Sequence, residues 1–129
     1  MRALLPPGWP RPKGYANGIS ASGRLIATAG VVGWTAGEQF ETDDLAGQFR
    51  QVLLNTLAIL AEDGAGPEHI VRMTWYVTDI DAYRNSLPEI GAAYRELIGK
   101  NFPAMAVVGV TALVEPRAKI EIETLAMVP

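Results

Sequence analysis

The stretch that decides the fold is NFPAMAVVGVTALVEPRAKIEIETLAM, residues 101–127. It predicts a hairpin of two strands with a turn at residues 115–117. In the first strand both alternating sets of side chains are largely apolar, which indicates that both faces are covered. The second strand alternates apolar and charged residues: Ala118, Ile120 and Ile122 against Lys119, Glu121 and Glu123. This period-two pattern is typical of a half-buried strand, and it places the carboxylates of Glu121 and Glu123 on the same face.

Composition and charge exclude several classes of function. The 129 residues fit one domain, residues 1–129, and the net charge of −3 provides no basic surface for nucleic acid. The chain has no cysteine, so it has no disulfide and no thiolate nucleophile, and we expect a cytoplasmic protein. Its single histidine, His69, excludes a metal site built from several histidines of one chain, and we expect no metal. No apolar run approaches the roughly 18 residues of a membrane span, so we expect no membrane partner.

The amino-terminal part of the chain predicts a second hairpin. YANGISA at 15–21 and RLIATAGVV at 24–32 are two β-forming runs separated by Ser22-Gly23. A Ser-Gly pair between two such runs is a turn signal. We therefore expect these two strands to pair with each other.

Between the two predicted hairpins, the spacing of apolar residues predicts a helix over 43–63, a strand over 69–79 and a helix over about 80–98. Thr42 or Asp43 is placed to cap the first helix. Pro88 predicts a kink or a new helix start within the second. The element order is thus β-β-α-β-α-β-β, which predicts an α+β fold in which two helices pack on one face of a mixed sheet.

The other face of this sheet must be covered or exposed to solvent. The side chains that we assign to it are all apolar: Val71, Met73, Trp75, Val77, Met105 and Val107. An exposed apolar patch of that kind is unusual on a monomer. We therefore expect the face to be buried by self-association.

Six stretches, in this order and spacing, make the chain resemble the RidA/YjgF family of small enamine/imine deaminases. They are KGYANGI at 13–19, IATAG at 26–30, QFRQVLLNTLAIL at 48–60, GPEHIVRMTWYVTDID at 66–81, FPA at 102–104 and KIEIETLA at 119–126. The resemblance covers nearly the whole chain. It implies a chorismate-mutase-like α+β fold and a homotrimer whose small-molecule pockets lie between adjacent subunits. It implies no cofactor.

The family's site residues transfer to this chain one at a time. The glutamate that positions or activates water matches Glu121, although a solvated strand glutamate is the alternative interpretation. The amino-terminal tyrosine matches Tyr15, which could equally close the sheet edge. The glycine beside the ligand matches Gly30. The serine that usually precedes it is Ala29 here, and Val107 stands where the family often has a pocket-lining cysteine.

One substitution concerns the substrate directly. Met105 replaces the arginine that follows FPA in the family and grips the substrate carboxylate. A thioether cannot donate the two parallel hydrogen bonds of a guanidinium. The usual substrate, 2-aminoacrylate, is therefore not the expected one. Arg72 is a possible replacement anchor or an ordinary surface charge, and Trp34 is a ligand-stacking wall or a packing residue.

Three functions follow as hypotheses. The first is cofactor-independent hydrolysis of a small reactive enamine or imine to a carbonyl compound and ammonia. The second is a non-catalytic trimer that binds a small metabolite or serves as a regulatory protein. The third is a ribonuclease, a label that this family sometimes carries. The negative net charge and the single histidine count against the third.

Overall fold

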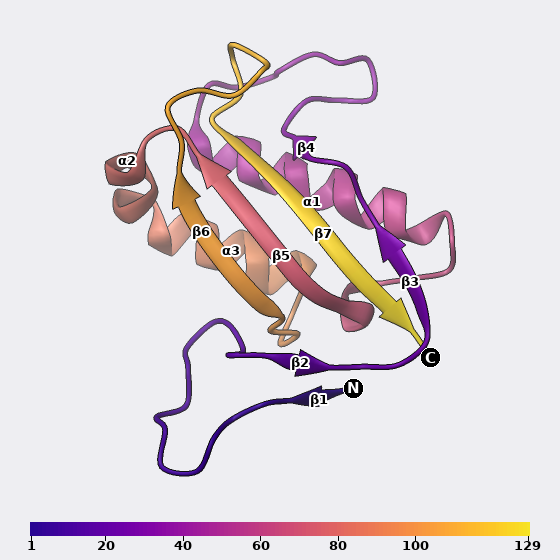
Figure 1. Cartoon of the computed structure of the whole chain (residues 1–129). Helices are drawn as coiled ribbons and strands as arrows, with labels where there is room; N and C mark the ends of the chain where they lie inside the picture. Colours follow the sequence, from indigo (N-terminus) through magenta and orange to yellow (C-terminus); the bar gives the residue numbers. More distant parts are fainter.

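The computed structural model describes all 129 residues and is built around one mixed β-sheet. The strands lie in the order β3 (Arg24–Ala27), β7 (Ile120–Val128), β5 (Ile70–Val77) and β6 (Ala104–Gly109) (Figure 1). The short strand β4 (Val31–Val32) also pairs with β7. β5 and β6 run parallel and all other pairs in this sheet are antiparallel. The mixed sheet expected from the sequence is therefore confirmed.

The helices lie on one face of this sheet, as Figure 1 shows. They are α1 (Leu45–Ala61), α2 (Ile80–Asn85) and α3 (Leu87–Leu97), and a single 3₁₀ turn, η1 (Pro67–His69), precedes β5. Pro88 lies in the first turn of α3, so the expected helix start is found there. The cap of α1 is Asp44 rather than Thr42 or Asp43, because the Asp44 carboxylate accepts the hydrogen bond of the Gly47 amide. No helix is both long and apolar enough to cross a membrane.

Both predicted hairpins are wrong in their strand pairing. β6 and β7 are not neighbours, because β5 lies between them and pairs with both. β2 (Ile19–Ser20) pairs with β1 (Arg2–Ala3) in a separate two-stranded sheet, and β3 pairs with β7. Gly23 has a φ of +137°, and a methyl group there would lie 2.1 Å from the carbonyl oxygen of Val128. The Ser22-Gly23 turn therefore directs β3 onto β7 instead of folding it back onto β2.

The sheet faces are also the reverse of the expectation. Met73, Trp75 and Val77 point toward the helices and are buried in the core, and Met105 and Val107 pack against the same core. The face away from the helices carries Arg72, Thr74, Tyr76, Glu121 and Glu123, all half-buried or exposed. The reason is that the apolar stripes of α1 and α3 need an apolar partner, and the apolar side chains of β5 supply it. The open face is therefore mixed: the polar residues of β5 and β7 lie on the same side as Leu25, Val108 and Leu125, which are exposed. Self-association stays a prediction.

Candidate functional site

The carboxylate of Glu121 lies against the backbone of Gly30. Glu121 lies on β7 opposite Val32 of β4, and this pairing brings the loop before β4 over its side chain. A methyl group at position 30 would lie 2.3 Å from Glu121 Oε2 and 2.7 Å from the carboxylate carbon. Only a residue without a side chain fits there with the carboxylate in this position. Glu121 is half-buried in this structure.

Ala29, Gly30 and Trp34 line one shallow hollow of about 430 Å³, together with the exposed side of α1. Asn55 of α1 fixes this segment, because its side-chain amide donates hydrogen bonds to the carbonyl oxygens of Val32 and Trp34 at 3.1 and 2.7 Å. The Trp34 ring packs at a tilt on a neighbouring Phe40 ring, with 5.8 Å between their centres. Three of the predicted site residues therefore lie together at this edge of the sheet.

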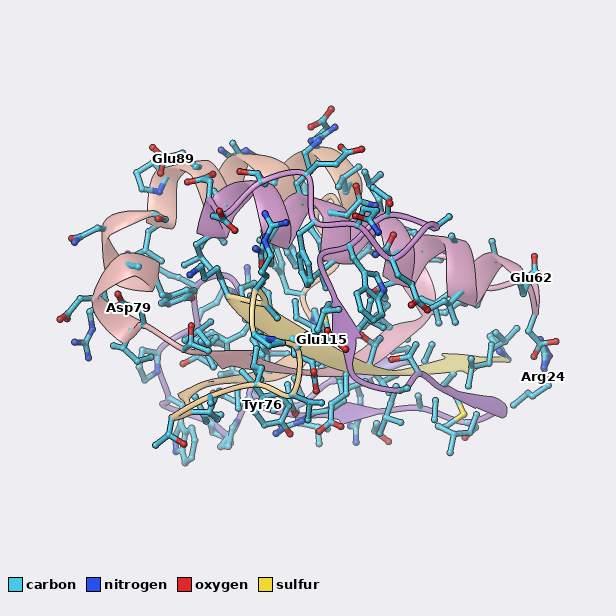
Figure 2. The ribbon with its side chains drawn as sticks, turned by 90° about the horizontal axis from the view of Figure 1, so that it is seen from above. Arg24, Glu62, Tyr76, Asp79, Glu89 and Glu115 are labelled. Carbon is cyan, nitrogen blue, oxygen red and sulfur yellow. The ribbon has the colours of Figure 1, made fainter.

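A polar cluster continues from Glu121 along the open face. Figure 2 shows Tyr76 on the side of the sheet away from the helices. Its hydroxyl donates a 2.5 Å hydrogen bond to Glu123 Oε1, and this bond raises the pKa of Tyr76. Arg72 lies on the same face, where it lines a second hollow of about 330 Å³ with Thr74 and Glu123. Arg72 makes no ion pair in this structure, so its charge faces solvent.

Met105 lies in a different place, on the helix-facing side of the sheet. It lines a hollow of about 520 Å³ that we call the aromatic hollow, between β5, β6, α2 and α3. Its lining residues are Lys13, Gly14, Trp75, Tyr83, Leu87, Ile90, Gly91, Tyr94, Arg95, Gly99, Lys100, Phe102 and Met105. The rings of Tyr94 and Phe102 are stacked with an interplanar angle of 8°. The ring centres of Trp75 and Tyr94 are 6.3 Å apart.

The tyrosines of the aromatic hollow are not suited to proton transfer. The Tyr94 hydroxyl donates a 2.5 Å hydrogen bond to the carbonyl oxygen of Asn101, and burial raises the pKa of Tyr94. Burial also raises the pKa of Tyr83. Both side chains therefore keep their protons at neutral pH. The hollow contains no aspartate, glutamate or histidine that could act as a base.

Tyr15 and Val107 lie near the aromatic hollow, whereas His69 lies in the turn before β5. Tyr15 is exposed and lines a third hollow of about 450 Å³, which shares Gly14, Lys100 and Phe102 with the aromatic hollow. Val107 is half-buried opposite Trp75 and packs against the core. His69 accepts a hydrogen bond from the Gly66 amide at Nδ1 and closes the turn before β5, which is a structural role.

The predicted site residues thus form two groups that one chain does not bring together. Glu121 lies on the open face, with Ala29, Gly30 and Trp34 at the adjoining edge, whereas Met105 and Val107 face the helices across the sheet. The aromatic residues around Met105 were missed as site residues, because Tyr83 and Tyr94 belong to the apolar stripe of the predicted helix. No three histidine, aspartate or glutamate side chains converge as a metal site would require.

Comparison with known proteins gives consistent matches over almost the full length. The family model described as endoribonuclease L-PSP matches residues 10–128. A RutC family protein from Aquifex aeolicus is 33% identical over 132 residues, which cover 98% of this chain and 99% of the relative.

Two solved structures extend the comparison to the fold. YyfB from Yersinia pestis, described as a protein of unknown function of the conserved Rid protein family, is 31% identical with a TM-score of 0.86, over 98% of both chains. A YjgF-family protein from Mycobacterium tuberculosis is 34% identical with a TM-score of 0.68, over 90% of this chain and 88% of that one.

Proposed function

This chain belongs to the RidA/YjgF family, and on that premise we propose that it is a homotrimeric deaminase acting on small reactive enamines or imines. An enamine would first tautomerise to the imine. Water then adds to the imine carbon, the C–N bond breaks, and the products are a carbonyl compound and ammonia. The reaction needs no cofactor, because water is the only co-reactant. We further propose that residues 1–129 act as one domain in the cytoplasm.

The observation that carries the proposal is the contact between Glu121 and Gly30. A carboxylate that positions water must be fixed and must remain reachable from a site, and general acid–base help depends on such positioning. Glu121 is half-buried and pressed against a backbone that has no side chain to displace it. Trp34 and Ala29 line the adjacent hollow. Glu121 is therefore the candidate water-positioning residue, and Gly30, Ala29 and Trp34 are candidate substrate contacts.

The proposed trimer follows from the division of the site. Met105, Val107 and Tyr15 are the remaining candidate substrate contacts, and none of them shares a hollow with Glu121 or Gly30. β6, which carries Met105 and Val107, is the edge strand of the sheet, and its outer side is met only at Ala104, by a bridge from Ala16. A second subunit placed along that edge could complete the site with its own Glu121. Sedimentation at micromolar concentration tests this, with three chains per particle expected and a stable monomer as the contrary result.

A second candidate is a non-catalytic trimer that binds a small metabolite. It is favoured by Met105, since the chain lacks the guanidinium that would anchor a carboxylate beside the reacting carbon. A ribonuclease has less support. The net charge is −3, and the single histidine is engaged at Nδ1 by the Gly66 amide.

The deciding experiment measures ammonia release from a panel of freshly generated imines by the native protein, Glu121→Gln and Glu123→Gln. Glu123 is the matched control, because it lies two residues along the same strand on the same face. We expect Glu121→Gln to lower turnover about 100-fold, the scale of general acid–base catalysis, with unchanged thermal stability. Glu123→Gln should stay close to the native rate. Equal rates for Glu121→Gln and native protein would refute the catalytic role, and binding without turnover across the panel would favour the metabolite-binding trimer.

A further inference from the structure

The shallow hollow beside Gly30, which we call the edge hollow, has the volume of a site for a small organic molecule. Its volume of about 430 Å³ lies within the range of roughly 300–1,000 Å³ that is usual for such sites. It lies between the segment 29–38 and α1, where Ala58 and Ile59 contribute apolar surface. Ile59 is 43% exposed, so this surface is open to a ligand. The edge hollow can therefore take a molecule with an apolar body.

Trp34 also lines the edge hollow, and its backbone is fixed against α1. Asn55 donates hydrogen bonds to the carbonyl oxygens of Val32 and Trp34 at 3.1 and 2.7 Å. The Trp34 ring packs on Phe40 and stays half-buried, so part of it remains accessible. Indole is the aromatic group that attracts cations most strongly. The edge hollow thus has a positioned ring that suits a positively charged ligand.

The charge of the edge hollow has one sign. Glu38 is the only charged residue of its lining, and it makes no ion pair. Arg117 lies over the Phe40 ring, 5.6 Å from its centre, but it is already paired with Asp43 at 3.0 Å. A carboxylate without a partner, beside an indole and apolar side chains, is complementary to an organic cation.

The backbone at Glu38 adds to this argument. Its φ is +59°, in the left-handed region that residues other than glycine rarely adopt. The turn is fixed by hydrogen bonds from the Glu38 amide to the Thr35 carbonyl oxygen and from the Thr35 amide to that of Gln39, at 2.8 and 2.9 Å. Glycine would take this conformation without strain, so the turn does not require a glutamate. Strained residues of this kind cluster at binding and active sites.

We infer that the edge hollow binds an organic cation, a protonated amine or imine with an apolar body, and that it disfavours carboxylates. The apolar body contacts Ala58 and Ile59, and the charged nitrogen lies between the Trp34 ring and the Glu38 carboxylate. A ligand carboxylate would instead face Glu38 with no cation in the lining to balance the two charges. This preference agrees with Met105, which leaves the chain without a guanidinium at that position.

The inference also names a substrate class for the proposed reaction, and in that part it rests on the proposed function. Gly30 lines the edge hollow, and a side chain on it would collide with the Glu121 carboxylate. A protonated imine that contacts Gly30 therefore has Glu121 as its next neighbour. Water bonds to the imine carbon and gives a proton to Glu121, while the C=N electron pair moves to nitrogen. Glu121 returns that proton to the nitrogen, the C–N bond breaks, and ammonia takes the hydroxyl proton as it leaves the carbonyl compound.

Binding is tested by calorimetric titration of the native protein at pH 7 with three probes of similar shape: 2-phenylethylamine, 2-phenylethanol and 3-phenylpropionate. The protonated amine should bind about tenfold more tightly than the alcohol, because charge-assisted hydrogen bonds are about twice as strong as neutral ones. The carboxylate should bind more weakly than the alcohol. Equal affinity for amine and alcohol, or tightest binding of 3-phenylpropionate, would overturn the inference.

A charge variant shows whether Glu38 holds the cation. Glu38→Gln should weaken 2-phenylethylamine binding about tenfold and leave 2-phenylethanol binding unchanged. Glu41→Gln is the matched control, because it removes the same charge from the same loop outside the lining. It should have little effect. Native affinity of a folded Glu38→Gln for the amine, or an equal loss in both variants, would refute the inference.

A helix variant locates the apolar body of the ligand. Ala58→Leu fills the edge hollow from an exposed position of α1 and keeps a good helix former there. It should weaken the binding of both amine and alcohol at least about tenfold, the scale of a blocked apolar pocket. Ala61→Leu is the control, since it is exposed on the same helix outside the lining. Native affinity of a folded Ala58→Leu would place the ligand elsewhere and contradict the inference.

Turnover separates the inference from the proposed reaction. Ammonia release is compared for the imine made from 2-phenylethylamine by an amine oxidase and the imino acid made from phenylalanine by an amino acid oxidase. The amine-derived imine should react at least about tenfold faster, in line with the binding preference. Faster turnover of the imino acid would overturn the substrate class and leave the deaminase standing. Preferred binding of the amine with no turnover of either imine would refute only the deaminase.

Discussion

The two faces of the sheet are made by the same strands but have different residues and different uses. On the helix-covered face, Met73, Val77, Ile120 and Ile122 are completely buried. On the open face β5 and the first half of β7 carry polar residues, and Tyr76 donates a hydrogen bond to Glu123 there instead of joining a core. The first face must fill space, so it is constrained by volume. The open face has no such constraint and can carry polar residues.

Substitutions in the core between the sheet and the helices should therefore lower the free energy of unfolding most. We expect the largest loss at Gln48. It is fully buried on α1, donates to the carbonyl oxygens of Thr42 and Arg117, and accepts from the Lys119 amide. Gln48→Leu leaves these three backbone groups without partners, which should cost about 3 kcal/mol or more. Urea unfolding followed by circular dichroism measures the loss. The exposed Gln39→Leu is the control and should change stability by less than about 0.5 kcal/mol. Similar losses for the two variants would contradict the assigned role of Gln48.

A substitution beside Glu121 on the open face should lower activity and leave stability nearly unchanged. Gly30→Ala places a methyl group 2.3 Å from Glu121 Oε2, so the flexible carboxylate must move away. We expect turnover of imines to fall about 100-fold, as for loss of general acid–base help, with little change in the thermal unfolding temperature. Gly37→Ala is the control in the same loop region, since its new methyl group would meet nothing closer than 3.9 Å. Full activity of Gly30→Ala would show that the position of Glu121 is not important for the reaction.

Met105→Arg would supply the carboxylate-binding guanidinium that this chain lacks at position 105. Met105→Arg introduces a guanidinium among the rings of the aromatic hollow. Activity on 2-aminoacrylate should rise by about tenfold, the worth of a charge-assisted contact. Keto-acid release at equal protein concentration measures it. Met105→Gln, of similar length but uncharged, should show no such gain. If a folded Met105→Arg gains no more than Met105→Gln, the anchor for small imino acids lies elsewhere.

The alkaline stability of the protein should depend in part on Tyr94, which is buried on the covered side. Burial raises the pKa of Tyr94 from its ordinary value of 10.0, so the folded state keeps a proton that the unfolded chain loses. The free energy of unfolding should stay level below pH 10 and then fall by up to about 1.4 kcal/mol per pH unit for this tyrosine. Tyr94→Phe should cost about 1 kcal/mol at pH 7 through the lost bond to Asn101, and it should flatten the decline. Urea titrations at pH 8 and pH 11 would reveal this. An equal decline in the variant would assign the effect to other groups.

Local patterns predicted the elements of this fold well but their partners poorly. The helix expected over 43–63 is Leu45–Ala61, and the strand expected over 69–79 is Ile70–Val77. Periodicity and capping are properties of neighbouring residues, so a single sequence contains them. The position of β5 between β6 and β7 depends on contacts between distant segments, and two adjacent strand patterns suggest a hairpin just as well.

The same distinction applies to the candidate site. Period-two alternation already placed Glu121 on the face opposite Ile120 and Ile122. Its contact with Gly30 depends on the pairing of β4 with β7, which no local pattern specifies. The aromatic hollow was missed because a helical stripe of apolar residues predicts burial and does not show where packing leaves space. Gly91, a glycine in the middle of α3, was the one local sign of that space.

The place of β7 in the sheet also bears on how the protein is made. β7 is the last strand in the sequence, yet β3, β4 and β5 all pair with it, and Arg24 meets Val128 across the sheet. A nascent chain that has not yet reached residue 120 therefore lacks the central strand of its own sheet. Such a topology has high contact order, so folding is slow and begins late in synthesis. Until β7 emerges from the ribosome, the apolar face of β5 has no completed core, and exposed apolar surface of this kind favours aggregation.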